Sequence, residues 1–346
     1  MSTLKVGVVG AGWAGRQHLG GFAARDDVEI VALAGLEVDQ VEALKAEFGI
    51  PATFPRWEQM LGEVELDAIS IATPTALHAP VAIAALERGI HVLTEKPIAA
   101  SLVDAQRMVD AARAAGRVLQ VVFNHRLRGD IAELARIIAA GEIGETYVAK
   151  AGWLRRAGIP ESGWFAKREL SGGGPLLDLG VHVIDYALRL LGEPDVLTVS
   201  ASTYAELGTK VIEGFDVEDI ALAFVRLSNG TTLTLETSWD AYRPNNNEFW
   251  MTVFGTEGGA ELRVIDYTES ELKVFRTRDG VVDDYVAVPG PSGAHPEVIA
   301  EFVDAVQAGP AEWPAHDGSL GLRRAAVIDA CYRSAESGHE VTVTAG

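Results

Sequence analysis

Residues 4–15 read LKVGVVGAGWAG, an apolar run of strand length that ends in a Gly-x-Gly-x-x-Gly turn. A helical pattern follows directly. In such a turn the first glycine allows the tight bend, the second lets a pyrophosphate approach the backbone, and the third lets helix and strand pack closely. The helix N-terminus adds free N–H groups for phosphate. We therefore expect a dinucleotide site with Gly10, Gly12, Trp13 and Ala14 against the cofactor. The alternative is a glycine-rich turn without a ligand.

The same alternation of strand and helix continues through the first third of the chain. Short apolar runs occupy 4–9, 28–34, 66–72, 91–94 and 118–123, and helical patterns fall near 12–24, 39–48, 76–88 and 101–115. Such alternation predicts parallel strands joined by right-handed crossovers, which form a doubly wound sheet. The expected fold class is thus α/β, with a dinucleotide-binding Rossmann domain over residues 1–123.

The end of the second apolar run bears on the choice between NAD and NADP. An acid there usually binds the adenosine ribose, and a nearby Arg suits a 2′-phosphate. Here Gly35 takes the usual place of the acid, Glu37 and Asp39 follow, and the next base is Lys45. Two acids without a base favour NAD, with Glu37 as a cofactor contact, and leave NADP open. Alternatively, both acids are solvated residues at a helix start.

Composition limits the classes of partner. The chain has 346 residues, a length that favours two domains. Of these residues 48% are hydrophobic and 23% charged, as is typical of globular proteins. A net charge of −20 disfavours nucleic acid and anionic membranes, which need clustered Lys and Arg. The single cysteine, Cys331, excludes a disulfide within the chain. We read no signal peptide and no apolar run long enough to span a bilayer, so we expect a cytoplasmic protein.

Residues 124–346 have a different pattern and are expected to form a substrate-binding and oligomerisation domain. Strand-like segments fall at 145–154, 196–207, 217–227, 230–239, 249–255, 258–266 and 271–277. Hairpin-like links such as Ser228-Asn229-Gly230 favour antiparallel neighbours, hence an α+β domain with a large open, mostly antiparallel sheet. Helices on one face leave the other free, so we expect a homodimer or homotetramer. Residues 295–337 look helical, with a break at 308–318.

A second informative segment, SGGGPLLDLGVHVID at 171–185, runs from glycines into an apolar helical pattern. Its polar residues Asp178, His182, Asp185 and Arg189 are spaced at i, i+4, i+7 and i+11, which places them on one narrow helix face. This spacing suggests a mostly buried helix with one edge on a cleft; the plain alternative is an amphipathic helix. No second histidine or thiolate completes a metal-ligand spacing, so we expect no metal.

A lysine stands where the fourth apolar run ends, in Thr94-Glu95-Lys96-Pro97. Ligands of open α/β sheets bind beyond the carboxyl ends of the strands. Lys96 is therefore placed to stabilise negative charge on a substrate oxygen, although a surface lysine beside a helix is an equal alternative.

Three motifs in this order, GAGWAG, EKP at 95–97 and GGGPLLDLGVHVID at 172–185, resemble the Gfo/Idh/MocA oxidoreductases. The resemblance covers essentially the whole chain, including ATPTALHAP at 72–80 and FNHRLR at 123–128. It implies a Rossmann domain followed by a domain on a large open sheet. It also implies NAD or NADP as cofactor, and sugars, sugar derivatives, amino sugars or cyclitols such as inositol as substrates.

The resemblance also assigns residues. It implies a catalytic group of Lys96, Asp178 and His182. The cofactor contacts that it implies beyond the glycine turn are Thr73, Pro74, His78, Glu95 and Lys96. The sequence departs from the family pattern at Thr75, where many relatives have Asn, and at Gly35, which bears on the cofactor.

These residue types suit hydride transfer. An alcohol carbon releases hydride readily only as its oxygen loses a proton. We assign His182 as the base, because its reference pKa is roughly 6.5, and Lys96 as the cation that holds the oxygen. Asp178 either binds a neighbouring hydroxyl or tunes the imidazole. Beyond these three, the expected substrate contacts are Asn124, Arg156 and Trp164; alternatively, some of them only pack.

The expected function is therefore an NAD(P)-dependent dehydrogenase acting on CH–OH groups. Two other classes remain open. One is a glycosidase that transiently oxidises its sugar with bound cofactor, and the other is a nucleotide-binding sensor without turnover.

Overall fold

The computed structural model describes residues 3–160 and 163–344, which form two compact units. The N unit contains the chain up to Asn124 together with Gly293–Ala325. The C unit contains His125–Ser292 together with the chain from Ala326 onward. The division at residue 123 stays a prediction about domains. The compact units differ from it, because 293–325 packs with the N unit although it follows the C-unit strands in sequence.

The N unit is built on a six-stranded parallel sheet of order β3-β2-β1-β4-β5-β6. This is the doubly wound strand order of dinucleotide-binding domains and confirms the predicted fold class. Its strands are β1 (Leu4–Val9), β2 (Val28–Ala34), β3 (Ala52–Phe54), β4 (Ala68–Ile71), β5 (His91–Thr94) and β6 (Leu119–Val121). Strand β3 was not predicted from the sequence, because its three residues are too few to form an apolar run of strand length.

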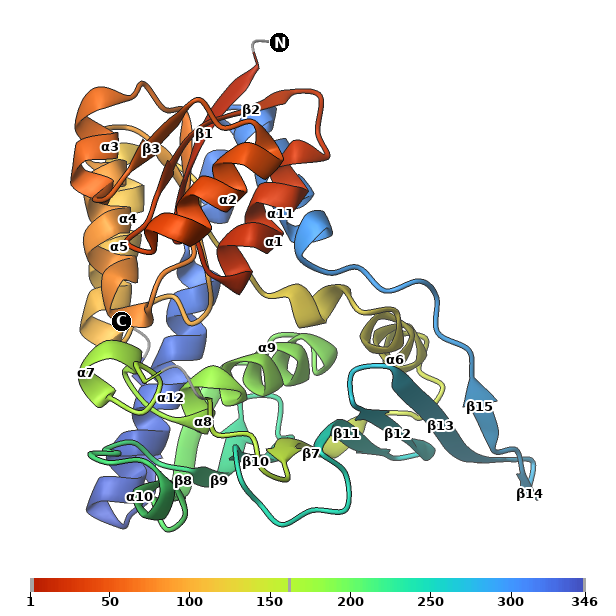
Figure 1. The fold of residues 1–346 in the computed structure, drawn as a ribbon. Helices are drawn as coiled ribbons and strands as arrows, with labels where there is room; N and C mark the ends of the chain where they lie inside the picture. The colour runs from red at the N-terminus through yellow and green to blue at the C-terminus, as the bar shows by residue number, and fades with distance from the viewer. Residues whose placement is uncertain (1–2, 161–162, 345–346) are drawn as a thin grey trace. The chain divides into compact units, whose positions relative to one another are not determined.

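Helices cover this sheet (Figure 1). They are α1 (Trp13–Ala23), α2 (Val38–Phe48), α3 (Trp57–Glu63), α4 (His78–Leu86), α5 (Leu102–Ala115) and α11 (His295–Ala308), with the short turns η1 (Thr75–Leu77) and η3 (Trp313–His316). Helix α11 packs on α1 so closely that a Cβ at Gly21 would lie 2.4 Å from Ile299 Cδ1. A glycine on α1 thus lets a distant segment approach the helix that follows the glycine-rich turn.

The C unit is built on a broad sheet of order β14-β13-β12-β11-β7-β10-β9-β8-β16, with β15 paired to β13. The pairing of β7 with β10 is parallel, while the other described pairs are antiparallel. The mostly antiparallel sheet is therefore confirmed. Its strands are β7 (Thr146–Arg155), β8 (Val196–Tyr204), β9 (Ile220–Leu227), β10 (Thr232–Ser238), β11 (Asn247–Gly255), β12 (Gly258–Ile265), β13 (Glu269–Arg278), β14 (Val281–Val282), β15 (Tyr285–Ala287) and β16 (Val341–Thr342).

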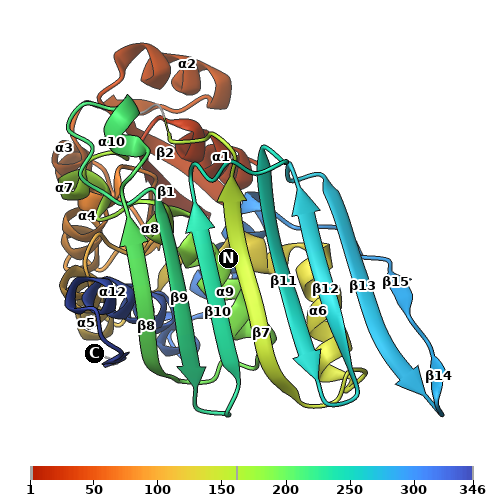
Figure 2. The ribbon, with the colours of Figure 1, turned by 90° about the horizontal axis from the view of Figure 1, so that it is seen from below.

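One face of this sheet packs against α6 and α9, which lie behind it in Figure 2. The helices of the C unit are α6 (Gly129–Ala139), α7 (Arg168–Ser171), α8 (Pro175–Asp178), α9 (Gly180–Leu190) and α10 (Gly208–Val211). Two further elements, η2 (Asn124–Leu127) and α12 (Ser319–Ser337), begin in the N unit and end in the C unit. In β9 buried and exposed residues alternate strictly, as they do in a strand with one covered and one open face.

The predicted helical stretch at 295–337, broken at 308–318, is confirmed by α11, η3 and α12. Within α12 the single cysteine, Cys331, is fully buried, and burial raises the pKa of its thiol to about 12. A thiol of that pKa is inert at neutral pH. Among the described residues, no helix is both long enough and apolar enough to cross a membrane.

Candidate functional site

The glycine-rich turn has the geometry that its three glycines predict. Gly10 has φ of 108°, and a Cβ there would lie 2.1 Å from the carbonyl oxygen of Ala72. A Cβ at Gly15 would lie 2.0 Å from the Gly10 carbonyl oxygen. At Gly12, by contrast, a Cβ would meet nothing within 4 Å. Packing therefore demands glycine at the first and third positions, whereas the second borders open space where a phosphate can approach.

Two further features of this region suit a polar ligand. Helix α1 begins at Trp13, and its N-cap Gly12 provides no side-chain capping bond, so a ligand can meet the first N–H groups. Trp13 is 69% exposed and Ala14 is half-buried. Just beyond β4, the hydroxyl oxygen of Thr73 is buried without a hydrogen-bond partner in the described parts of the chain. An orphaned buried hydroxyl beside the turn fits a bound dinucleotide.

At the end of β2 the structure explains the unusual glycine. A Cβ at Gly35 would lie 2.9 Å from Val41 Cγ2 and 3.2 Å from Ala11 Cβ. An acid at this position would therefore need Val41 to move. Glu37 is exposed at the start of α2, where its side chain is accessible to a ligand.

The EKP tripeptide follows β5 and is tied to the loop after β4. The peptide between Lys96 and Pro97 is cis, and the Lys96 side chain is half-buried. His78 bridges the two loops: Nδ1 lies 2.8 Å from the Pro97 carbonyl oxygen and Nε2 lies 3.1 Å from that of Thr73. Burial lowers the pKa of His78, so the ring is neutral and donates its single N–H to one of the two carbonyl oxygens. The predicted cofactor residues Thr73 and His78 therefore sit in the same loop network as Lys96.

Glu95 lies in a buried cluster with two histidines. Its Oε1 is 3.0 Å from His18 Nε2 and 3.4 Å from His295 Nε2, and its Oε2 accepts the backbone N–H of Lys96 at 3.1 Å. Burial raises the pKa of Glu95, but the hydrogen bonds and charges of both histidines outweigh that effect and hold the pKa below its ordinary value. The carboxylate is thus ionised and anchors the backbone of Lys96.

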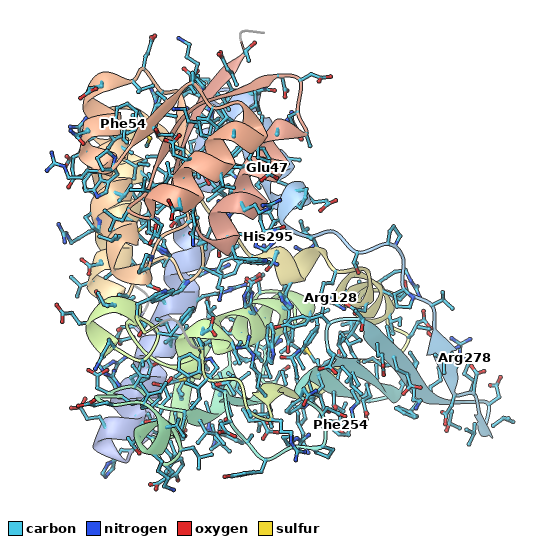
Figure 3. All side chains as sticks on the ribbon, viewed as in Figure 1. Glu47, Phe54, Arg128, Phe254, Arg278 and His295 are labelled. Carbon is cyan, nitrogen blue, oxygen red and sulfur yellow. The ribbon has the colours of Figure 1, made fainter. Side chains whose placement is uncertain are left out.

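His295 reaches this cluster from the start of α11, where Figure 3 labels it. Its ring makes an edge contact with Trp13, with centroids 5.3 Å apart. The amide Nδ2 of Asn124, a half-buried residue expected to bind substrate, lies 3.5 Å from His295 Nδ1. His295 therefore touches both the glycine-rich turn and the glutamate of the EKP motif.

The ligand atoms of His18, Glu95 and His295 lie within 4.8 Å of one another, close enough to hold a metal ion. However, His18 already makes two hydrogen bonds, because its Nδ1 lies 2.6 Å from Ser70 Oγ and its Nε2 contacts Glu95. Both ring nitrogens are satisfied without a metal. We therefore interpret the cluster as a hydrogen-bond network.

In the C unit, the predicted continuous helix through Asp178 and His182 is wrong. Asp178 ends the short α8, and Gly180 begins α9. A Cβ at Gly180 would lie 3.1 Å from Leu176 Cδ1, so the glycine permits a tight junction of the two helices. Between the two helices only Leu179 intervenes, and it keeps right-handed helical backbone angles, with φ of −95° and ψ of −42°.

The other two residues of the predicted polar face, Asp185 and Arg189, lie in different surroundings. Asp185 is buried and forms a two-bond ion pair with Arg126, at 2.5 and 3.0 Å. Arg189 is exposed. Asp185 is therefore a paired core carboxylate, which is the usual condition for a buried charge.

His182 is 6% exposed and lies in a cluster of aromatic rings. Its ring centroid is 4.6 Å from that of His125 and 5.7 Å from that of Trp153. Phe249 packs on His125 at 5.2 Å, and Trp153 donates its indole N–H to Asn247 Oδ1 at 2.7 Å. Two rings, those of His125 and Trp153, therefore pack against the imidazole of His182.

Asp178 stands at the end of a row of aromatic side chains. The indole N–H of Trp239 donates to Asp178 Oδ2 at 2.9 Å. Phe165 meets Trp239 edge to face at 6.1 Å, and Trp164 stacks on Phe165 at 3.7 Å. The structure thus connects the predicted substrate residue Trp164 with Asp178 through two rings.

The remaining predicted substrate residue, Arg156, is exposed, and its guanidinium donates to the Arg243 carbonyl oxygen at 2.8 Å. Lys96 belongs to the N unit, whereas Asp178 and His182 belong to the C unit. The three assigned roles stay predictions.

Sequence analysis missed His18 and His295 and did not identify the bond between Trp239 and Asp178. His18 has a weak local signal, because it follows Gly15 by three residues and falls on the buried side of α1. His295 has none, since it lies 200 residues beyond the motif that it contacts.

Comparison with known proteins places the chain in a family of oxidoreductases. The family described as "Oxidoreductase family, NAD-binding Rossmann fold" matches residues 4–123, and the "GFO/IDH/MocA C-terminal domain" matches residues 131–261. D-glucoside 3-dehydrogenase of Escherichia coli (strain K12) is 32% identical, over 98% of this chain and 97% of the relative. Levoglucosan dehydrogenase of Pseudarthrobacter phenanthrenivorans is 30% identical, over 75% of this chain and 73% of the relative.

A solved structure of levoglucosan dehydrogenase in complex with NADH and levoglucosan superimposes with a TM-score of 0.85 at 25% identity. It covers 98% of this chain and 99% of the other. Matched along nearly its whole length in sequence and in fold, the chain belongs to the Gfo/Idh/MocA family of oxidoreductases and begins with an NAD-binding Rossmann domain.

Proposed function

We propose that the protein is an NAD-dependent dehydrogenase that acts on a CH–OH carbon of a sugar, a sugar derivative or a cyclitol such as inositol. The observation that carries the substrate class is the half-buried stacked pair Trp164 and Phe165, which Trp239 connects to the half-buried carboxylate of Asp178. Aromatic faces pack on the apolar faces of sugar rings, and a carboxylate accepts hydroxyl hydrogens. The named relatives, a glucoside dehydrogenase and a levoglucosan dehydrogenase, support the same class.

In the proposed mechanism, His182 accepts the proton of the reacting hydroxyl in the oxidative direction and returns it in reduction. The rings of His125 and Trp153 beside it support this role, because their packing restricts the directions that the imidazole can take. Lys96 holds the substrate oxygen and stabilises the negative charge that develops there. The nicotinamide, when bound, accepts or supplies the hydride.

For Asp178 we propose direct contact with a hydroxyl next to the reacting carbon. The bond from the indole N–H of Trp239 supports this choice over tuning of the imidazole, because it orients the Asp178 carboxylate through a residue outside α8 and α9. Asn124, Arg156 and Trp164 complete the proposed substrate contacts.

The proposed cofactor contacts are Gly10, Gly12, Trp13 and Ala14 of the turn, with Glu37, Thr73, Pro74, His78, Glu95 and Lys96. The open space at Gly12 and the orphaned Thr73 hydroxyl fit a dinucleotide. Exposed Glu37 and Asp39, with no base before Lys45, support NAD over NADP, because a 2′-phosphate carries negative charge.

The first test is an absorbance screen for NADH or NADPH formation with hexoses, glycosides, uronates, phosphosugars and inositols. We expect NADH from one class of sugar or cyclitol and a lower kcat/KM with NADP. Glycoside cleavage without reduced cofactor would contradict a net dehydrogenase and indicate the transient-oxidation glycosidase. Tight NADH binding without turnover of any compound would indicate a sensor.

We also propose that the protein is a homodimer or homotetramer that buries the open face of the C-unit sheet. This face carries exposed aromatic side chains, among them Phe224 and Phe254, and the latter is labelled in Figure 3. Contiguous exposed apolar side chains are typical of interfaces.

Light scattering is expected to give the mass of a dimer or tetramer for the natural chain and a smaller mass for Phe224→Glu. A carboxylate introduced on a face that is buried on association is costly because it is desolvated. The matched control is Val103→Glu, at a 70% exposed position on α5, which should leave the mass unchanged. A monomeric natural chain would contradict the proposal.

The acidic charge and the lone buried cysteine support a cytoplasmic enzyme with small-molecule partners, and neither nucleic acid nor membrane belongs to this proposal.

A further inference from the structure

Trp239 is held in place from both sides. It follows β10 directly, its side chain is fully buried, and its backbone N–H donates to the Asp219 carbonyl oxygen at 3.1 Å. The preceding Ser238 hydroxyl donates to the same oxygen at 2.8 Å. An indole N–H is a donor only, so at 2.9 Å it fixes Asp178 Oδ2 as its acceptor. The direction of this bond is set by a ring that has no room to turn.

Glu218, next to Asp219 in sequence, holds the backbone of the segment that carries Asp178. Its carboxylate is 3% exposed and accepts the N–H groups of Gly174 and Leu176, each at 3.0 Å. The hydroxyl of Tyr332 donates to the same carboxylate at 3.0 Å. The start of α8 is thus clamped to Glu218, two residues before β9.

The clamp explains two of the three glycines before α8, Gly173 and Gly174. A Cβ at Gly174 would lie 1.9 Å from the Glu218 carbonyl oxygen. A Cβ at Gly173 would lie 2.0 Å from the Tyr332 hydroxyl. Any side chain at either position would push the loop away from Glu218, and Asp178 would move with it.

We infer that Trp239 and Glu218 are positioning residues for Asp178, with Trp239 fixing its carboxylate and Glu218 fixing its backbone. The inference rests on the proposed function, in which Asp178 contacts a substrate hydroxyl. A carboxylate that is already oriented loses little conformational entropy when the sugar binds. Small displacements of a group at the site can lower the rate by large factors. Neither residue needs to touch the substrate for this effect.

The test is a double-mutant cycle of Trp239→Phe with Asp178→Ala. Trp239→Phe keeps an aromatic ring and removes the donor, and it should lower kcat/KM for the sugar about 10- to 100-fold. In the Asp178→Ala background the same change should cost less than about twofold, because the carboxylate to be positioned is gone. Trp313→Phe is the matched control: it also removes an indole N–H, which donates to the Val306 carbonyl oxygen at 2.9 Å in the N unit, so its effect should be much smaller.

Glu218→Gln is the second variant, because it acts on the backbone of the segment and leaves the Trp239 ring intact. It should also lower kcat/KM, and the loss should again shrink in the Asp178→Ala background. NADH affinity should stay unchanged in both single variants, since their contacts lie in the C unit. Equal losses with and without Asp178 would overturn the inference.

A spectroscopic readout is independent of turnover. In 15N-labelled protein the indole N–H signal of Trp239, assigned with Trp239→Phe, should shift and exchange faster with solvent in Asp178→Ala. The indole of Trp313, which donates to the Val306 carbonyl oxygen at 2.9 Å, should not change. An unmoved Trp239 signal would overturn the inference. If the signal moves while Asp178→Ala keeps full activity, the proposed role of Asp178 fails, and the positioning inference fails with it.

Discussion

Lys96→Met is expected to lower kcat by about 10²- to 10⁴-fold, the range over which a positioned catalytic group contributes. The substitution keeps the length of the side chain and removes the ammonium that stabilises charge on the substrate oxygen. The backbone of Lys96 should stay in place, because its N–H donates to Glu95, whose carboxylate is held by two histidines. Steady-state kinetics on the sugar identified in the screen, with NADH affinity by fluorescence titration, would measure the effect.

The matched control is Lys45→Met on α2, where the ammonium lies 3.9 Å from Glu42 Oε2 near the surface. An exposed pair of this kind contributes little, so both kcat and NADH affinity should stay near the natural values. A Lys96→Met enzyme with unchanged kcat would remove Lys96 from the proposed mechanism. A loss confined to NADH affinity would make it a cofactor contact only.

Alanine substitutions at the first two glycines of the turn are expected to have different effects, one on stability and the other on NADH binding. Gly10→Ala should destabilise the N unit, because its Cβ would lie 2.1 Å from the Ala72 carbonyl oxygen at φ of 108°. Backbone strain alone costs of order 1–3 kcal/mol, and the collision adds to it. Gly12→Ala meets nothing within 4 Å and should keep its melting temperature. Its methyl group should nevertheless weaken NADH binding about tenfold or more, because it occupies the space into which a pyrophosphate approaches.

Thermal unfolding and NADH titration of Gly10→Ala and Gly12→Ala test these two expectations, with Gly20→Ala as the control. Gly20 lies on α1 and a Cβ there also meets nothing within 4 Å, but it stands two turns further along the helix. It should bind NADH normally. If Gly12→Ala binds NADH as tightly as Gly20→Ala does, the open space at Gly12 is not the phosphate site.

Much of the fold could be predicted from the sequence, because strands and helices follow from local patterns. The Rossmann strands β1, β2, β4, β5 and β6 coincide with short apolar runs, and the mostly antiparallel sheet follows from alternation and turn residues. The short β3 escaped, since three residues have no periodicity to detect. The continuous helix through Asp178 was wrong because periodicity does not register a junction that packing at Gly180 allows.

The doubly wound sheet, the glycine turn and the residue types of the proposed site could be predicted from the chain alone, because each depends on neighbours a few positions apart. The surroundings of those residues are visible only in the folded protein. Glu95 meets His18 across 77 positions, and Asp178 meets Trp239 across 61. Asp185 likewise meets its buried partner Arg126 across 59 positions. Contacts over such separations depend on how whole elements pack, and a periodic pattern within one element carries no information about them.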